Sequence, residues 1–145
     1  MPETVRDVLV EAINDEYKAR AMYRHVIDRF GAIRPFVNIV DAESRHIEAL
    51  LPLFEKYGVA VPEDDWASRT EVPQSILAAC RAGVDAEIEN ARMYDRLLAL
   101  MAEYPDVQQV LVRLQRASSE NHLPAFQRCV ERGGGRGHGR RGWKP

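Results

Sequence analysis

The sequence predicts an all-α protein, a four-helix bundle in which two antiparallel helical hairpins are joined by a long crossover. Apolar residues recur at spacings of three and four in four stretches, which is the pattern of a helix with one buried face. The links within each expected hairpin are short, whereas residues 59–73 form a long, Pro-containing connector. Fully extended, this connector could span about 50 Å, enough to travel the length of a bundle and make the third helix parallel to the second.

The first hairpin is expected from two helices with recognisable end signals. The first helix covers residues 4–30, with Thr4 as a plausible N-cap and Gly31 just after its end. Pro35 suits the first turn of the second helix, which covers residues 35–57. Because only a few residues separate them, these two helices should pack as an antiparallel pair.

The second hairpin is expected from residues 76–101 and 105–130, with Pro105 at the break between its helices. Pro124 lies inside the fourth helix and cannot donate a hydrogen bond to the carbonyl of Glu120. We therefore expect a kink or a weakened turn in that helix.

Length and composition predict one domain, a bundle over residues 1–132, followed by a disordered Gly/Arg-rich tail over residues 133–145. The formal net charge of -2 gives no general attraction to nucleic acid or to a membrane. The few basic residues of the tail favour a solubilising role over nucleic-acid binding. No signal peptide and no apolar stretch of membrane-spanning length is visible, so a cytoplasmic protein is expected.

Four buried positions are occupied by ionisable residues. Glu43 and His46 form a Glu-x-x-His pair on the apolar face of the second helix, and residues three apart on a helix are neighbours. Glu16 and Glu87 each interrupt the apolar stripe of another helix. A metal ion would compensate the buried charge, and oxygen plus imidazole ligands suit iron, manganese or zinc. For the Glu-x-x-His pair alone, a core histidine bonded to a core glutamate is the alternative.

An internal repeat relates the two hairpins. Residues 16–23 and 87–94 share Glu, Met and Tyr at the same positions, and residues 42–47 and 118–123 share a His followed by an apolar residue. The repeat predicts that the inward-facing polar residues of both hairpins point into one volume. The two tyrosines are expected to be core aromatics with hydrogen-bonded hydroxyls rather than redox relays.

Over roughly residues 5–132 the chain resembles the ferritin-like di-iron carboxylate proteins, which place a Glu on each of two helices and a Glu-x-x-His on each of the other two. The matching residues are Glu16, Glu43, His46, Glu87 and His122. More narrowly, the chain is similar to a prokaryotic ferritin-like family of unassigned function. That similarity is carried by Arg34-Pro35-Phe36, Glu55-Lys56-Tyr57-Gly58 and Asn121-His122-Leu123. The chain departs from the di-iron pattern at Ser119, where the fourth carboxylate would lie, and Glu120 is rotated by about 100° from that position.

The resemblance implies two bound iron ions, with manganese or a single metal as alternatives. Glu16 and Glu87 would be terminal ligands, Glu43 a bridge, and His46 and His122 one ligand for each metal. It also implies an oxidoreductase, either an oxidase or a peroxidase. Such an enzyme would use O2 or peroxide and would take electrons from an external donor. The alternative is a non-catalytic ferritin-like scaffold or binding protein with a degenerate metal site. A homo-oligomer is compatible with either function.

The two cysteines allow a further prediction about the core. Cys80 lies seven residues before Glu87 and Cys129 seven after His122, so both should be buried and close together. The same count in the first hairpin gives Leu9 and Leu53, and we expect Leu9, Leu53, Cys80 and Cys129 to form one layer. A cytoplasmic location favours two free thiols over a disulfide.

Overall fold

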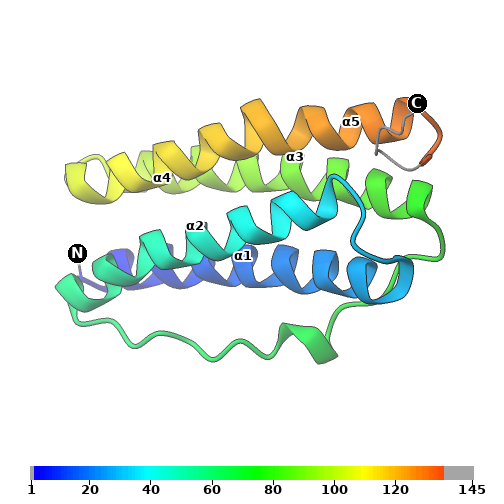
Figure 1. Cartoon of the computed structure of the whole chain (residues 1–145). Helices are drawn as coiled ribbons and strands as arrows, with labels where there is room; N and C mark the ends of the chain where they lie inside the picture. The colour runs from blue at the N-terminus through cyan, green and yellow to red at the C-terminus, as the bar shows by residue number, and fades with distance from the viewer. Residues whose placement is uncertain (1, 136–145) are drawn as a thin grey trace.

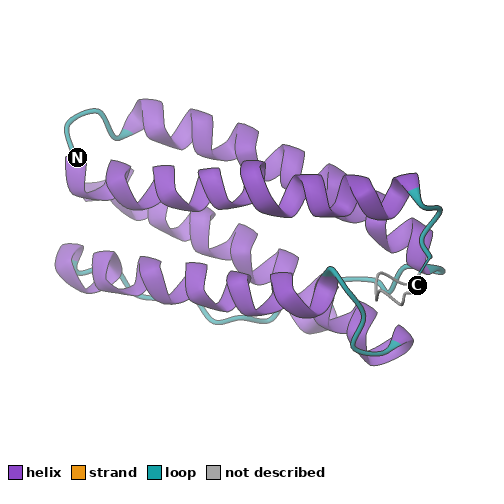
Figure 2. Cartoon of the chain, turned by 45° about the horizontal axis from the view of Figure 1, so that its top comes forward, coloured by secondary structure: helices purple, strands orange, loops and turns teal. Residues whose placement is uncertain are grey.

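The computed structural model describes residues 2–135, and its architecture confirms the all-α four-helix bundle (Figure 1). No strand occurs in that range. The elements are α1 (Pro2–Phe30), α2 (Phe36–Tyr57), η1 (Trp66–Ser68), α3 (Ile76–Leu100), α4 (Pro105–Ala117), η2 (Ser118–His122) and α5 (Leu123–Glu131). Helices α4, η2 and α5 follow one another without a break and together make the fourth rod of the bundle (Figure 2).

Most helix ends follow the signals in the sequence. The expectation of an N-cap at Thr4 is wrong, because α1 begins at Pro2 and Thr4 lies inside the helix. Gly58 ends α2 in the left-handed conformation, with φ of 66°, and Val59 closes the end by donating to the Phe54 carbonyl. The Ser75 hydroxyl caps α3 by accepting a hydrogen bond of 3.0 Å from the Ala78 backbone N–H. Pro105 occupies the first turn of α4, where its missing N–H costs nothing.

The crossover runs along the outside of the first hairpin and makes α3 parallel to α2, as predicted (Figure 1). Several polar contacts hold it against α1, among them a 2.7 Å hydrogen bond between His25 and the Ala67 carbonyl. The Tyr17 hydroxyl donates to the Pro62 carbonyl at 3.2 Å, Arg20 pairs with Asp64 at 3.2 Å, and the Trp66 indole donates to Asn14 at 3.1 Å. As a result the crossover covers one side of the bundle.

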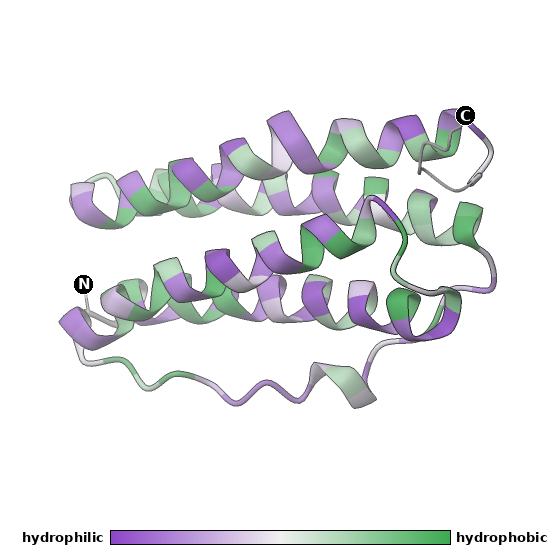
Figure 3. Cartoon of the chain, in the orientation of Figure 1, coloured by the Kyte–Doolittle hydropathy of each residue, from purple (hydrophilic) through white to green (hydrophobic). Residues whose placement is uncertain are grey.

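Apolar and polar residues are interspersed along every helix (Figure 3), and the buried apolar side chains form two clusters. One cluster gathers the first half of α1 and the second halves of α2 and α3, and it includes Leu9 and Leu53. The other gathers the opposite ends of these helices with α5, and it includes Cys80 and Cys129. The single-layer prediction is therefore wrong. Because the crossover makes α3 antiparallel to α1, seven residues before each glutamate lead toward opposite ends of the bundle.

The cysteines themselves are buried and adjacent, as predicted, with a Cα–Cα distance of 6.0 Å. The expectation of two free thiols is wrong, because Cys80 and Cys129 form a disulfide between α3 and α5. Helical spacing places two side chains at one level, but whether their Cβ atoms point together depends on how the two helices are rotated.

The interruption expected near Pro124 is a π-helical segment, η2, directly before α5. The Leu123 N–H donates to the Ser118 carbonyl five residues back, instead of the usual four. One extra residue is thereby inserted into the turn that carries His122.

The remaining expectations concern membrane-spanning helices, the C-terminal tail and the limit of the domain. Within residues 2–135, no helix is both long enough and apolar enough to cross a membrane. Gly133 and Gly134 form a turn after α5, and the tail predicted for residues 133–145 lies outside the described residues from residue 136 on. The domain limit at residue 132 remains a prediction.

Candidate metal centre

The five side chains singled out by the repeat come together in the middle of the bundle, between the two apolar clusters. Each is almost completely removed from solvent. Their relative exposures are 0% for Glu16, 2% for Glu43, 7% for His46, 2% for Glu87 and 4% for His122. None of the five points to solvent, so the geometric expectation from the repeat holds.

One half of the centre is formed by the first hairpin. The Nδ1 atom of His46 lies 3.3 Å from Oε1 of Glu16 and 3.2 Å from Oε1 of Glu43. Glu43 and His46 project from the same face of α2, one turn apart, toward Glu16 on α1. An imidazole nitrogen and two carboxylate oxygens thus face one small volume.

The other half is formed by the second hairpin together with the same Glu43. The Nδ1 atom of His122 lies 3.4 Å from Oε1 of Glu87 and 4.0 Å from Oε1 of Glu43. The His46 and His122 rings are nearly parallel, with centroids 5.4 Å apart and an interplanar angle of 15°. Glu43 is therefore the carboxylate common to both halves.

The two buried tyrosines hold the outer oxygens of the two single glutamates. The Tyr23 hydroxyl donates to Oε2 of Glu87 at 2.7 Å, and the Tyr94 hydroxyl donates to Oε2 of Glu16 at 2.5 Å. Burial and the adjacent carboxylates raise the pKa of both phenols well above their ordinary value, so both stay protonated as donors. This agrees with the expectation of core aromatics with hydrogen-bonded hydroxyls.

In the metal-free protein the carboxylates differ in their affinity for a proton. Burial, with the charges of Glu16 and Glu87, raises the pKa of Glu43 well above its ordinary value. Burial also acts to raise the pKa of Glu16, but hydrogen bonding and charge from His46, with bonds from Tyr94 and Glu43, outweigh it and lower this pKa. Of this pair, Glu43 is therefore the carboxyl group that holds a proton more strongly.

Three buried atoms of the centre have no hydrogen-bond partner: Oε1 of Glu43, Oε1 of Glu87 and Nδ1 of His122. Buried polar atoms are normally hydrogen-bonded, so several unpaired acceptors facing one volume need a positive partner. Ligand atoms of Glu43, His46 and His122 all lie within 4.8 Å of one another, which suits a single ion on their own. The nitrogen and oxygen donor set fits iron or manganese.

The position expected for a fourth carboxylate differs from the prediction. Ser119, expected there, is exposed, whereas Ser118 is buried with 1% exposure. The π-helical turn before His122 shifts the helix by one residue, so the inward position one turn before that histidine belongs to Ser118. Glu120 is exposed and pairs with Arg116 at 3.3 Å, so it lies off the inward face as predicted.

Residues that the sequence analysis did not single out surround the centre. Asn90 is buried and donates to Asp15 at 2.6 Å, a contact that joins α3 to α1. Burial, opposed by this bond and reinforced by Glu16 and Glu87, raises the pKa of Asp15 to about 6. The sequence held one hint that these two residues lie near the centre. Asp15 directly precedes Glu16, and Asn90 follows Glu87 by three residues.

Residues 6–141 match a protein family described as the uncharacterized protein domain DUF2202. The chain belongs to this family. The match includes both hairpins, so all five side chains of the centre lie within the DUF2202 domain. The search among curated proteins found no match.

The DUF2202 chain also resembles solved structures. One is the bacterioferritin of Desulfovibrio desulfuricans, a structure described by its diiron site in different catalytic states. It is 19% identical to this chain and superimposes with a TM-score of 0.75, over 90% of this chain and 80% of that one. At this identity the likeness establishes the fold, a ferritin-like four-helix bundle, which the resemblance in the sequence predicted.

Proposed function

We propose that this DUF2202 protein binds two iron ions in the middle of the bundle and acts as an oxidoreductase on O2 or peroxide. The observation that carries the proposal is the pair of histidine–carboxylate sets that share Glu43. Two sets with one common carboxylate form the arrangement that two neighbouring cations require. Glu16 and Glu87 would each serve one ion, with His46 and His122 on the same two ions.

A cation explains the centre better than side-chain packing does. Three glutamates in a dry interior are costly unless their charge is balanced. Arg20 does not balance it, because its guanidinium donates to the Ser44 hydroxyl and to Asp64 at the edge of the bundle. His46 and the hydroxyls of two tyrosines compensate part of this charge, but Oε1 of Glu43, Oε1 of Glu87 and Nδ1 of His122 still have no hydrogen-bond partner.

The residues around this centre orient its ligands and surround it with apolar groups, which suits redox chemistry. Tyr23 and Tyr94 fix the outer oxygens of Glu87 and Glu16, so their other oxygens stay directed inward. The two apolar clusters shield the centre from water along the axis of the bundle. Bound iron would supply the change of oxidation state by which electrons pass to O2 or peroxide.

The choice of iron, and of two ions, rests on chemistry and on likeness. The bacterioferritin that shares this fold is described by a diiron site, which favours iron over manganese for this chain. A single ion at Glu43, His46 and His122 is the alternative stoichiometry. An external electron donor and a homo-oligomer are parts of the same proposal. A cytoplasmic location stays a prediction. The Cys80–Cys129 disulfide argues against it, because disulfides are typical of oxidising environments.

A second candidate function, a non-catalytic scaffold with a degenerate metal site, is favoured by one observation. Ser118 occupies the inward position where a fourth carboxylate would complete the set. Three carboxylates leave two divalent cations with one uncompensated positive charge, so the second ion should bind more weakly than the first.

Metal analysis separates the two functions. Untagged protein is loaded anaerobically with Fe(II), passed through a desalting column and assayed for iron per chain, and its oxidation by O2 or peroxide is followed by absorbance. The proposal expects more than one iron per chain and oxidation faster than that of free Fe(II). Substantially less than one iron per chain would establish the scaffold instead. Glu48→Gln, an exposed change on α2, is the matched control and should load like the parent.

A further inference from the structure

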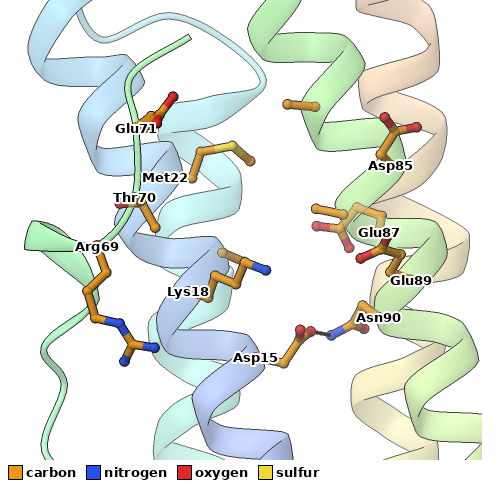
Figure 4. Close-up of a pocket in the computed structure, with 13 residues that line it drawn as sticks. Asp15, Lys18, Met22, Arg69, Thr70, Glu71, Asp85, Glu87, Glu89 and Asn90 are labelled. Atoms are coloured by element: carbon orange, nitrogen blue, oxygen red, sulfur yellow. Dashed lines mark hydrogen bonds between the residues drawn. The ribbon is translucent and has the colours of Figure 1, made fainter.

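A cavity of about 390 Å³ opens to solvent between α1, α3 and the end of the crossover. Figure 4 shows the side chains around it, with Asp15, Lys18 and Met22 from α1 facing Asp85, Glu87 and Asn90 from α3. Its wall includes Glu87, which also belongs to the proposed metal centre. The cavity therefore borders one of the five converging side chains.

The inner wall of the cavity carries polar atoms that lack partners. Glu87 and Asn90 both line it, and both are at least nine-tenths buried. Oε1 of Glu87 and Oδ1 of Asn90 have no hydrogen-bond partner. Two unpaired oxygen acceptors on neighbouring turns of α3 are the kind of ligand that a hard or borderline cation accepts.

Asp15 closes the inner end from the α1 side. Its carboxylate accepts the 2.6 Å hydrogen bond from Asn90, so the two side chains meet across the gap between the hairpins (Figure 4). The neighbour of Asp15 in sequence is Glu16, and Asn90 lies one helical turn after Glu87. The pair thus lines the cavity beside Glu87.

The charge around the cavity is negative. Glu71, Asp85 and Glu89 line its outer part and are exposed, in addition to Asp15 and Glu87 further in. Two cationic side chains also line it, and one of them is already compensated. Arg69 pairs with Asp65 at 3.0 Å and stacks on the Trp66 ring at 3.8 Å. A cleft lined by uncompensated carboxylates concentrates cations and repels anions.

Small side chains leave the cavity wide enough to admit an ion with part of its hydration shell. Ala19 from α1 and Ala82 and Ala86 from α3 line the cavity where the two helices face one another. Longer side chains at these positions would close the space between the hairpins.

We propose that this cavity is the route by which divalent cations reach the centre. Asp15 and Asn90 form an intermediate binding station, and Glu87 is the group that receives the ion. This inference rests on the proposed function, because it requires a cation-binding centre at the inner end. A cation at the station would be held by the Asp15 carboxylate and the Asn90 amide oxygen, once their mutual hydrogen bond opens.

The test measures how fast the metal-free, full-length protein takes up Co²⁺, using the visible absorption of the bound ion in a stopped-flow experiment at low ionic strength. Glu71→Gln/Glu89→Gln removes two charges from the outer part of the cavity. The matched control, Glu48→Gln/Glu55→Gln, removes two exposed charges from α2, away from the cavity. We expect uptake by the cavity variant to be roughly threefold to tenfold slower than by the parent, with the same final amount bound. Added salt should reduce this difference.

A second variant tests the passage itself. Ala86→Leu should slow both uptake and release of Co²⁺ without changing the final occupancy, because it narrows the route and leaves the five proposed ligands in place. Equal uptake rates in the parent and both cavity variants, or equal slowing in the α2 control, would overturn this inference while the proposed centre stands. A parent protein that binds no Co²⁺ would overturn the proposed function and this inference with it.

Discussion

The hydroxyl of Tyr23 on α1 donates to the carboxylate of Glu87 on α3, at 2.7 Å. The equivalent residues of the repeat make the corresponding contact in the opposite direction: the hydroxyl of Tyr94 on α3 donates to the carboxylate of Glu16 on α1. Each hairpin therefore completes the polar environment of the other. The hydroxyl that bonds each single glutamate therefore comes from the other hairpin, which makes the interface between the hairpins the place where stability and the centre are linked.

Removing one of these hydroxyls should destabilise the protein. Tyr23→Phe leaves a buried carboxylate oxygen of Glu87 without its donor, and such losses cost about 1–3 kcal/mol of unfolding free energy. The measurement is urea denaturation of the metal-free protein. Tyr17→Phe is the control, because its hydroxyl bonds a neutral carbonyl of the crossover and should cost less. An equal effect of both variants would show that the contact with Glu87 has no special weight.

Glu43 should be indispensable for metal binding. It is the carboxylate shared by both histidine sets, so Glu43→Ala removes a ligand from each proposed ion, and we expect iron loading to be lost altogether. Glu120→Ala should load like the parent, because Glu120 is exposed and paired with Arg116. Iron per chain after anaerobic loading decides the matter. Equal losses from the two variants would mean that Glu120 supplies the missing ligand.

The metal-free protein should lose stability as the pH rises from about 4.5 to about 6. Glu43 has a raised pKa in the folded state, and the pKa of Asp15 is raised from 3.8 to about 6. Both groups thus bind more protons in the folded than in the unfolded chain, and stability falls as pH rises between their unfolded and folded pKa values. Glu16, whose pKa is lowered, acts in the opposite sense only below its ordinary value of 4.5.

Thermal unfolding across this pH range is the measurement, with and without bound metal. Glu43→Gln, which cannot ionise, should flatten the pH dependence of Tm in the metal-free protein. Bound metal should do the same, because the ion replaces the proton on Glu43. A Tm that rises with pH in the metal-free parent would contradict the raised pKa of the buried carboxyl groups.

The disulfide should contribute strongly to stability. Cys80 and Cys129 are separated by 49 residues, and closing a loop of that length in the unfolded chain corresponds to about 4 kcal/mol. Reduction of the parent should lower the urea midpoint by a corresponding amount, and mass spectrometry before reduction should find no free thiol. The double variant Cys80→Ala/Cys129→Ala is the control and should not respond to the reductant. A parent that does not respond either would show that the bond is absent in solution.

The periodic pattern and the internal repeat allowed most of the fold to be predicted. The helix limits at Gly31, Gly58 and Pro105 are local matters of backbone conformation and hydrogen bonding, and they appear where the sequence places them. The inward direction of Glu16, Glu43 and the other polar residues follows from the angle between successive side chains on a helix. These features depend on residues within a few turns of each other, which is why the sequence by itself determined them.

The tertiary structure decided how separate helices contact one another. Leu9 and Cys80 occupy equivalent positions in the repeat but lie at opposite ends of the bundle, because the direction of α3 is set by the path of the crossover. Likewise, Ser118 rather than Ser119 faces inward, because the π-helical hydrogen bonding of η2 inserts one residue into the turn before His122. The exchange of Tyr23 and Tyr94 between glutamates, and the bond between Cys80 and Cys129, arise where separate helices meet. Such contacts depend on the relative rotation and direction of whole helices, and helical periodicity within one segment carries no information about either.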